Sequence, residues 1–502
     1  MAEIVTVTGG EVRGSSVGGV TRFLGIPYAA APIGPARFEA PRPVVAWSGV
    51  RDALEFGPTC VQSPYPPPIH ALLGSDGIPG DEYLHVNVWA PENAGGDLPV
   101  MVWIHGGAFT RGANSRTIYD GTAFARDGVV LVSINYRLGI SGFANIPGSA
   151  SNRGLRDQIR ALEWVRDNIA AFGGDPGNVT VFGESAGGMS VVALLAAPPA
   201  RGLFRRAIAQ SANGSAVATA EDADKVARQL ADLLGLEPTA AAFGALGADE
   251  LRSAQDALAL ELLADPDPER WGASIITSGL GLMSFFPMID GEIVPDRPVD
   301  VLAAAPDRTV PLLTGWTAEE FRFFTFPTGL AAAITEQTLP PLLARYGLDP
   351  AVVDRYTANR PQAGPADVFA AVLTDHVFRD DAMRIAESSA AAGNPAYVYE
   401  FAWRSGIADL GACHVVEIPF VFDQLDAAHA LLGPTPPQRL ADEVHRAWVR
   451  FATHGDPGWS RFDTATRTVR VFDSPESHEV ADPRADELRA LRRAKLTSGA
   501  SV

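Results

Sequence analysis

Three short apolar runs along the chain predict strands. Residues 100–104 read Val-Met-Val-Trp-Ile, residues 178–182 read Asn-Val-Thr-Val-Phe, and residues 309–315 read Thr-Val-Pro-Leu-Leu-Thr-Gly. Apolar runs of this length, rich in β-branched residues and bounded by turn residues, are typical of buried strands rather than helices. We therefore expect a strand at each of these three places.

Helical patterns fill much of the remaining chain. A run of small residues at 188–197 follows the second strand, and residues 439–453 have the pattern of an amphipathic helix. The Ala-rich segment 219–263 and the Ala/Leu-rich segment 330–375 have helical periodicity and little strand character. Strands and helices together predict an α/β protein, with the two long segments as helical insertions.

The strand at 178–182 leads directly into the sequence Gly183-Glu184-Ser185-Ala186-Gly187. Gly-x-Ser-x-Gly between a strand and a helix is the pattern of a nucleophile elbow, whose sharp turn lifts the serine hydroxyl above the edge of the sheet. The two glycines are small because the strand and helix backbones pass close together at this turn. Ser185 is therefore predicted to be a catalytic nucleophile.

A nucleophilic serine needs an oxyanion hole, a base and an acid that orients the base. The strand at 100–104 ends in His105-Gly106-Gly107-Ala108-Phe109, and two adjacent glycines let backbone N–H groups turn toward a developing oxyanion. The N–H groups of Gly106, Gly107 and Ala186 would form a hole with three donors. Taken alone, the loop could equally be an ordinary glycine turn after a strand rather than an oxyanion hole.

The base must be one of nine histidines. His414 follows Gly411-Ala412-Cys413 late in the chain, where hydrolases with such an elbow have the base. His105 belongs to the glycine loop, and His445 lies in the amphipathic stretch 439–453. His414 is therefore the predicted base.

The acid is expected between the nucleophile and the base, after a strand. The strand at 309–315 is followed by Trp316-Thr317-Ala318-Glu319-Glu320. Either Glu319 or Glu320 could accept a hydrogen bond from the imidazole, and their spacing alone does not separate them.

Specific motifs follow one another along nearly the whole chain. Besides the glycine loop and the elbow they are Gly25-Ile26-Pro27-Tyr28-Ala29, Trp47-Ser48-Gly49-Val50-Arg51, Leu84-His85-Val86-Asn87-Val88-Trp89, Asn135-Tyr136-Arg137-Leu138-Gly139, Phe172-Gly173-Gly174-Asp175-Pro176 and Trp448-Val449-Arg450-Phe451-Ala452. In these motifs the chain resembles the type-B carboxylesterases, the branch of the α/β-hydrolases that includes bacterial p-nitrobenzyl esterases and animal cholinesterases. It is most similar to the bacterial members.

The resemblance implies an α/β-hydrolase fold with a large, mostly parallel central sheet, helices on both faces, an N-terminal β-hairpin and inserted helical lobes at about 219–263 and 330–375. It also implies that the acid is Glu320, because Glu319 falls on the acidic position that precedes the family's glutamate. Phe321 stands where the family usually has glycine, which puts the local loop shape in doubt. Since the triad would span Ser185 to His414, residues 1–502 are expected to form one catalytic domain, larger than the usual size of roughly 100–200 residues.

The resemblance also assigns supporting residues. Glu184 matches a carboxylate that points into the family's gorge, where it would place water or act electrostatically. Ser211 matches a serine near the catalytic histidine, although an ordinary hydroxyl at a strand end is an equal alternative. Two buried ion pairs are expected from matching positions: Arg137 with Asp157, and Arg37 with Asp81.

Candidate substrate contacts come from the same comparison. The segment 278–286 resembles the family's acyl-pocket loop, with Gly, Leu and Met where cholinesterases have bulky aromatic residues, so a permissive pocket is expected. A phenylalanine cluster follows the acid, and its rings could equally be plain core packing. The candidates are Phe109, Glu184, Met283, Phe285, Phe321 and Phe324.

Composition narrows the possible partners. The net charge of −19 and the lack of a basic patch argue against binding to nucleic acid or to anionic membranes, and no apolar run reaches the roughly 18–20 residues of a membrane span. The N-terminus lacks a signal-peptide pattern.

Cys60 matches the first cysteine of a family disulfide, but Tyr83 occupies the partner position, so no bridge is expected. We therefore expect a cytoplasmic protein, monomeric or a small homo-oligomer.

These observations predict a serine carboxylesterase that acts on small-molecule esters with short to medium acyl groups, aromatic esters included, and needs no metal or organic cofactor. The alternative is a carbamate or amide hydrolase with the same triad, which would differ in pocket shape. A non-enzymatic binding role is disfavoured because nucleophile, acid, base and glycine loop are all present.

Overall fold

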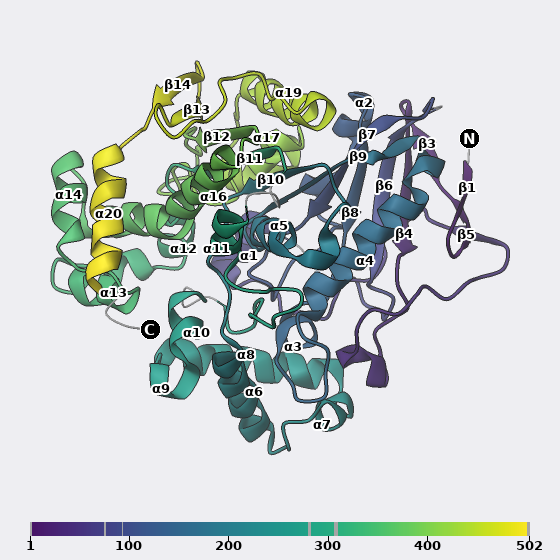
Figure 1. The fold of residues 1–502 in the computed structure, drawn as a ribbon, viewed down its shortest axis with the longest axis horizontal. Helices are drawn as coiled ribbons and strands as arrows, with labels where there is room; N and C mark the ends of the chain where they lie inside the picture. The colour runs from purple at the N-terminus through teal and green to yellow at the C-terminus, as the bar shows by residue number, and fades with distance from the viewer. Residues whose placement is uncertain (1–2, 75–76, 93, 280–282, 306–309, 499–502) are drawn as a thin grey trace.

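A twisted mixed sheet runs through the middle of the molecule in the computed structural model, which describes residues 3–74, 77–92, 94–279, 283–305 and 310–498 (Figure 1). In these residues the sheet has 11 strands in the order β14-β13-β12-β11-β10-β9-β7-β8-β6-β4-β3. Neighbouring strands from β13 to β8 are parallel, and strands at both edges are antiparallel. The strands are β3 (Ser15–Val17), β4 (Val20–Pro27), β6 (His85–Pro91), β7 (Leu98–Ile104), β8 (Val130–Ile134), β9 (Gly174–Glu184), β10 (Arg206–Gln210), β11 (Leu312–Thr317), β12 (Ala396–Phe401), β13 (Thr468–Phe472) and β14 (His478–Ala481).

The predicted strands coincide with the centre of this sheet. The apolar runs at 100–104 and 178–182 lie in β7 and β9, and the third run leads into β11 at Leu312, while Thr309 lies outside the described residues. The side chains of 100–104 are fully buried. Strands covered on both faces have no solvent side, which explains their continuous apolar sequence.

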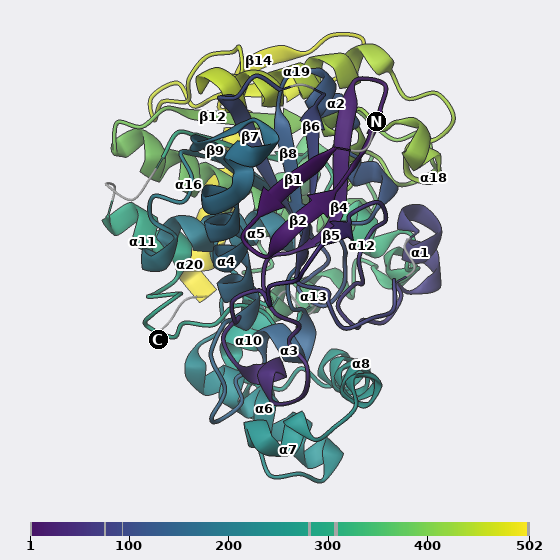
Figure 2. The same ribbon diagram turned by 90° about the vertical axis from the view of Figure 1, so that its right-hand side faces the viewer.

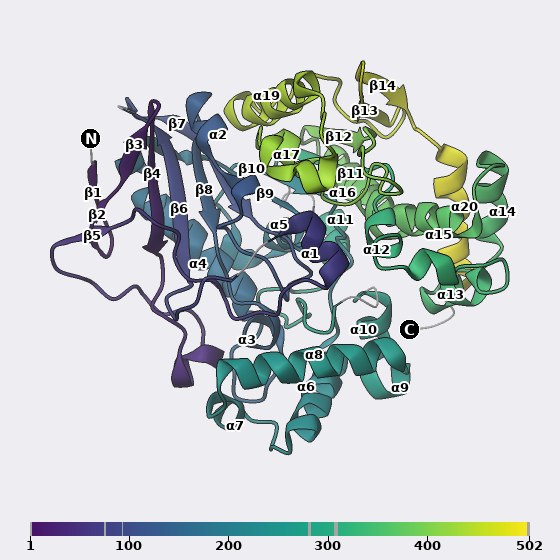
Figure 3. The same cartoon turned by 180° about the vertical axis from the view of Figure 1, so that it is seen from behind.

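Helices cover both faces of the sheet, as expected. In Figures 1 and 3, α4 (Arg153–Asn168) and α5 (Ala186–Ala196) lie on one face, while α2 (Thr122–Arg126) and α19 (Gln438–His454) lie on the other. Helix α5 is buried along its whole length, and α19 has one buried stripe. The predicted helices at 188–197 and 439–453 are therefore confirmed.

The N-terminal hairpin stands apart from the main sheet. Strands β1 (Ile4–Val7) and β2 (Gly10–Arg13) pair antiparallel, and β5 (Val50–Asp52) adds to β2 in parallel. Figure 2 shows this small sheet in front of the edge of the main sheet. The expected β-hairpin is present.

The two predicted insertions are helical. The first contains α6 (Ala220–Leu234), α7 (Ala240–Gly244) and α8 (Ala248–Ala264), which form a lobe at the bottom of Figure 3. The second contains α13 (Leu339–Arg345), α14 (Val352–Asn359) and α15 (Pro365–Thr374), beside the C-terminal α20 (Ala485–Ser498). Across the described ranges, no helix has the length and apolar character needed to cross a membrane.

One of the two expected buried ion pairs is present. Arg137 Nη2 lies 2.6 Å from Asp157 Oδ1, and both side chains are fully buried. The pair Arg37–Asp81 was wrongly predicted, since Arg37 Nη1 instead donates to the carbonyl of Leu246 at 2.8 Å. Asp81 lies on the surface, where its carboxylate is solvated and needs no buried partner.

Candidate active site

Ser185 occupies the sharp turn between β9 and α5. Its φ of 56° and ψ of −124° lie outside the regions that non-glycine residues usually adopt. A Cβ on Gly183 would lie 2.6 Å from the backbone of Gly187, and a Cβ on Gly187 would lie 2.0 Å from a carbonyl oxygen of β7. Only glycine fits at these two positions, so the close approach of strand and helix backbones enforces the turn.

The Gly106–Gly107 loop lies against this turn. A Cβ on Gly106 would be 3.1 Å from the Cβ of Ser185. Gly107 has a φ of 118°, and a Cβ there would be 2.1 Å from the carbonyl oxygen of Arg111. Within the described residues, the backbone N–H groups of Gly106, Gly107 and Ala186 donate to no protein acceptor. They are three unused donors beside the serine.

A buried histidine–glutamate pair lies beside them. His414 Nδ1 and Glu320 Oε2 are 2.5 Å apart. The second oxygen of Glu320 accepts hydrogen bonds from Ser211 Oγ at 2.6 Å and from the N–H of Thr317 at 2.8 Å. An ionised carboxylate only accepts, so in the neutral imidazole the proton is on Nδ1 and the lone pair is on Nε2. Ser211 thus supports the glutamate that contacts the histidine.

Glu319 points away from the histidine. Its carboxylate accepts a hydrogen bond from the N–H of Ala412 at 2.9 Å and forms an ion pair with Arg404 at the surface. Its side chain keeps 24% exposure, whereas Glu320 is fully buried. Of the two adjacent glutamates, only Glu320 contacts His414.

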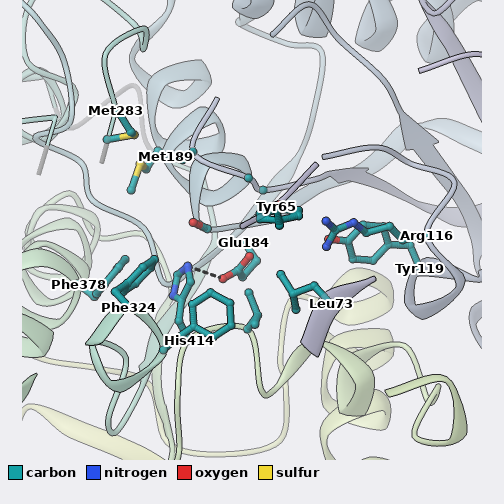
Figure 4. Close-up of a pocket in the computed structure, with 16 residues that line it drawn as sticks. Tyr65, Leu73, Arg116, Tyr119, Glu184, Met189, Met283, Phe324, Phe378 and His414 are labelled. Atoms are coloured by element: carbon teal, nitrogen blue, oxygen red, sulfur yellow. Dashed lines mark ion pairs between the residues drawn. The ribbon is translucent and has the colours of Figure 1, made fainter. Parts of the chain in front are cut away.

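Two more buried carboxylates surround the imidazole. Glu184 Oε1 lies 3.1 Å from His414 Nε2 (Figure 4), and Glu417 is buried with its Oε2 unpartnered. Burial raises the pKa of Glu184 to about 7 and the pKa of Glu417 well above its ordinary value. In the described part of the chain, no hydrogen bond joins Nε2 to the hydroxyl of Ser185. Such bonds are often long without substrate and align when it binds.

Ser185, His414, Glu184 and the glycine loop line one cavity, whose space of about 660 Å³ is partly open to solvent (Figure 4). Its wall is mostly apolar with a few polar groups, which is typical of a small-molecule site. No group of three or more His, Cys, Asp or Glu side chains within the described ranges could hold a metal ion. The lining residues are Tyr65, Leu73, Gly106, Gly107, Ala108, Arg116, Tyr119, Glu184, Ser185, Met189, Met283, Phe323, Phe324, Phe378, His414 and Val415.

Half of the predicted substrate contacts lie on this wall. Glu184 and Met283 line the cavity, and so does Phe324, whose ring centroid is 5.1 Å from that of His414. In Figure 4, Met283 and Phe324 lie on the same side of the cavity as His414. Residues 280–282 of the predicted acyl-pocket loop lie outside the described residues.

The other three predicted contacts are core residues. Phe109 is fully buried, and its ring packs against Phe143 at a centroid distance of 4.9 Å. Phe321 packs against Phe369 at 6.1 Å, and Phe285 is also buried away from the cavity wall. The expectation that these three rings touch substrate is therefore corrected: they fill the space behind the wall.

Several lining residues were not predicted from the sequence. Met189 is one turn into α5, and the helical period starting at the elbow would have indicated it. Arg116 precedes a short 3₁₀ turn, Thr117–Tyr119, and is one of two arginines within ten residues of the glycine loop, a signal that went unused. Tyr65 and Phe378 come from distant parts of the chain, and no local pattern marks them.

Known proteins match this chain over nearly its whole length. Residues 1–482 match the model of the Carboxylesterase family. The chain is 35% identical to para-nitrobenzyl esterase of Bacillus subtilis (strain 168), over 97% of this chain and 98% of that protein. It is 34% identical to phenmedipham hydrolase of Pseudarthrobacter oxydans, over 98% and 97% of the two chains. A crystal structure of a carboxylesterase from Geobacillus stearothermophilus has a TM-score of 0.84 and 34% identity, covering 97% of this chain and 99% of that one.

Sequence and fold point to the same family. The family model spans most of the chain, and the relatives are covered almost from end to end. The mixed sheet with helices on both faces is the architecture of the matched structure as well. The chain therefore belongs to the carboxylesterase family and is a carboxylic ester hydrolase with an α/β-hydrolase fold.

Proposed function

We propose that this protein is a serine carboxylesterase that hydrolyses esters with short to medium acyl groups, aromatic esters included, through Ser185, His414 and Glu320. The observation that carries this proposal is the 2.5 Å contact between His414 Nδ1 and Glu320 Oε2 on the wall of the cavity that also contains Ser185. Ser185 and His414 are far apart in the sequence but line the same cavity, and the contact of the imidazole with Glu320 supports the assignment of a catalytic triad.

In this mechanism His414 Nε2 takes the proton of Ser185 as the hydroxyl oxygen attacks the ester carbonyl. Glu320 holds the imidazole in its tautomer and stabilises the imidazolium. The N–H groups of Gly106, Gly107 and Ala186 donate to the tetrahedral oxyanion, and each such donor contributes about 3 kcal/mol. The alcohol leaves with the proton from the imidazolium, and water then hydrolyses the acyl-enzyme by the same steps.

The proposed substrate range rests on the cavity wall. Met189 and Met283 are flexible and can adapt to acyl groups of different length. Phe323, Phe324 and Phe378 supply aromatic faces beside His414, with centroids 6.1, 5.1 and 5.0 Å from the imidazole. Such faces favour stacking with aromatic esters.

Matched substrates test this function against the alternative of a carbamate or amide hydrolase. We expect turnover of p-nitrophenyl acetate, butyrate and octanoate, with a burst of p-nitrophenol where deacylation is slower than acylation. Matched p-nitrophenyl carbamates and p-nitroanilides should give a kcat/KM at least about tenfold lower. A higher kcat/KM for the carbamate or anilide than for the ester would favour the alternative. If no ester, carbamate or anilide is turned over, both the esterase and the carbamate or amide hydrolase hypotheses are contradicted.

The pH dependence of kcat/KM should show the effect of the neighbouring carboxylates on the pKa of His414. Burial lowers the pKa of His414, but Glu184 and Glu320 outweigh it and raise this pKa to about 9. A general base must be neutral, so kcat/KM should rise with pH through a pKa above the ordinary histidine value. Glu184→Gln removes one charge that favours the imidazolium, and it should move this acidic limb to lower pH by about one unit. Profiles for both proteins on p-nitrophenyl butyrate measure the shift, and a limb that stays or moves to higher pH would contradict the assignment.

A cytoplasmic location is part of the proposal. Cys60 and Cys413 are buried free thiols. Burial raises the pKa of Cys60 to about 11, so its thiol is unreactive at neutral pH. Two unbridged cysteines are consistent with a reducing compartment.

A further inference from the structure

The cavity contains a buried cation that the proposed mechanism does not use. Arg116 lines the cavity and is only 9% exposed. Its Nε and Nη2 atoms are buried and have no hydrogen-bond partner. In the parts of the chain that the structure describes, Arg116 belongs to no ion pair. Both atoms have almost no accessible surface, so they do not themselves face the cavity space. The cavity wall therefore contains a buried cation with which no carboxylate of the described residues pairs.

Other buried arginines of this protein are compensated. Arg137 pairs with Asp157, and Arg379 pairs with Asp375 at 2.9 Å. Arg153 donates to several backbone carbonyl oxygens. A buried charge without such partners costs several kcal/mol. Arg116 has no such ion pair within the described residues, and it lies on a cavity wall where a ligand can supply the missing partner.

Aromatic side chains hold the guanidinium in position. Its central carbon lies 5.0 Å from the centroid of the Tyr65 ring, in cation–π geometry. Tyr119 lies beside it in Figure 4, on the side of the cavity opposite to His414 and Met283. A ligand that reaches from Ser185 toward Tyr65 would therefore meet the cation.

A guanidinium is permanently charged, and a carboxylate is the partner that its planar set of N–H donors binds most strongly. Glu184 is the carboxylate among the residues that line the cavity, and burial raises its pKa to about 7, which weakens its repulsion of a second anion near neutral pH.

We propose that Arg116 binds a carboxylate group of the substrate, so that the preferred substrates are esters that also carry a free carboxylate, such as monoesters of dicarboxylic acids or acyl esters of hydroxyaryl carboxylic acids. This inference rests on the proposed function, because it assumes that the ester carbonyl is attacked at Ser185. It adds a charge requirement that an apolar cavity wall would not impose.

The test compares charged esters with neutral partners of the same shape. Monoethyl adipate is paired with ethyl methyl adipate, and 4-acetoxyphenylacetate is paired with its methyl ester; release of ethanol or of the phenol is followed. Wild type should have a higher kcat/KM for the charged member of at least one pair. In Arg116→Gln the ratio of charged to neutral kcat/KM should fall at least tenfold, mainly through KM, and Arg116→Lys should restore part of it.

Arg111→Gln is the matched control. Arg111 lies over the same Tyr65 ring, with its guanidinium carbon 5.9 Å from the centroid, but it faces Asp256 at 3.8 Å and does not line the cavity. Its loss should leave the ratio within about twofold. A wild type that prefers the neutral member of both pairs, or an equal fall of the ratio in both variants, would overturn the inference.

A binding measurement separates this inference from the proposed function. Calorimetric titration of Ser185→Ala with 4-hydroxyphenylacetate and with the neutral 4-hydroxyphenylacetamide needs no turnover. The carboxylate should bind more tightly than the amide, and adding Arg116→Gln should remove that difference. If p-nitrophenyl butyrate is hydrolysed but the carboxylate has no advantage in binding, only the carboxylate site is wrong. If binding depends on Arg116 but no ester is hydrolysed, only the proposed function is wrong.

Discussion

Replacing Ser185 with alanine is expected to lower kcat for p-nitrophenyl butyrate by about 10⁶-fold, to the level left by the oxyanion donors and binding alone. The serine hydroxyl is the nucleophile of the proposed mechanism, and the cavity wall has no second hydroxyl at the elbow to replace it. The substitution removes a single oxygen, so we expect KM to change little. Steady-state kinetics with purified wild type and variant measure the loss.

Covalent labelling is the control for this experiment. A serine-directed sulfonyl fluoride should add one label to wild type, on the peptide that contains Ser185, and none to Ser185→Ala. Equal thermal unfolding of the two proteins would exclude loss of fold. Wild-type activity or labelling of the variant at another serine would show that the elbow does not supply the nucleophile.

Replacing Glu320 with glutamine is expected to lower kcat by about 10⁴-fold, the size of effect found when the acid of a serine triad is neutralised. A glutamine can present its NH₂ group to His414 Nδ1 and so favour the wrong tautomer, and it cannot stabilise the imidazolium. The 2.5 Å contact and the full burial of Glu320 make the interaction strong, because little solvent screens it.

Glu319→Gln is the matched control, since it makes the same change one residue earlier. Its carboxylate faces Arg404 and the N–H of Ala412 rather than the base. We expect its kcat to stay within about tenfold of wild type. A larger loss in Glu319→Gln than in Glu320→Gln would reverse the assignment of the acid.

Three residues of the cavity wall have strained backbone conformations. Ser185, Ala108 and Val415 have φ values of 56°, 54° and 67°. A positive φ is unusual for any residue with a Cβ and most unusual for a β-branched one such as Val415. Such conformations persist only where surrounding packing enforces them, and they are common at sites that hold catalytic groups in advance. The fold therefore fixes Ser185, the glycine loop and the residue after His414, the groups of the proposed mechanism, before a substrate arrives.

The sequence by itself determined the features that depend on short-range chemistry. The elbow is recognisable because Gly183 and Gly187 must be small where strand and helix cross, and the glycine loop because Gly107 needs a positive φ. The buried parallel strands are recognisable because they have no solvent face, and the insertions because they have helical periodicity and little strand character. These rules act within about ten residues, so the elements and the candidate nucleophile could be predicted.

Only the tertiary structure decided which groups meet. Glu319 and Glu320 are adjacent and chemically alike, and it is the packing of the turn after β11 that points one to Arg404 and the other to His414. Core and cavity wall are both apolar in sequence, so Phe324 on the wall could not be separated from Phe321 behind it. Arg116 could not be singled out from the sequence either. An arginine is expected to be an ordinary surface residue, and only the fold shows that this one is buried without an ion-pair partner among the described residues.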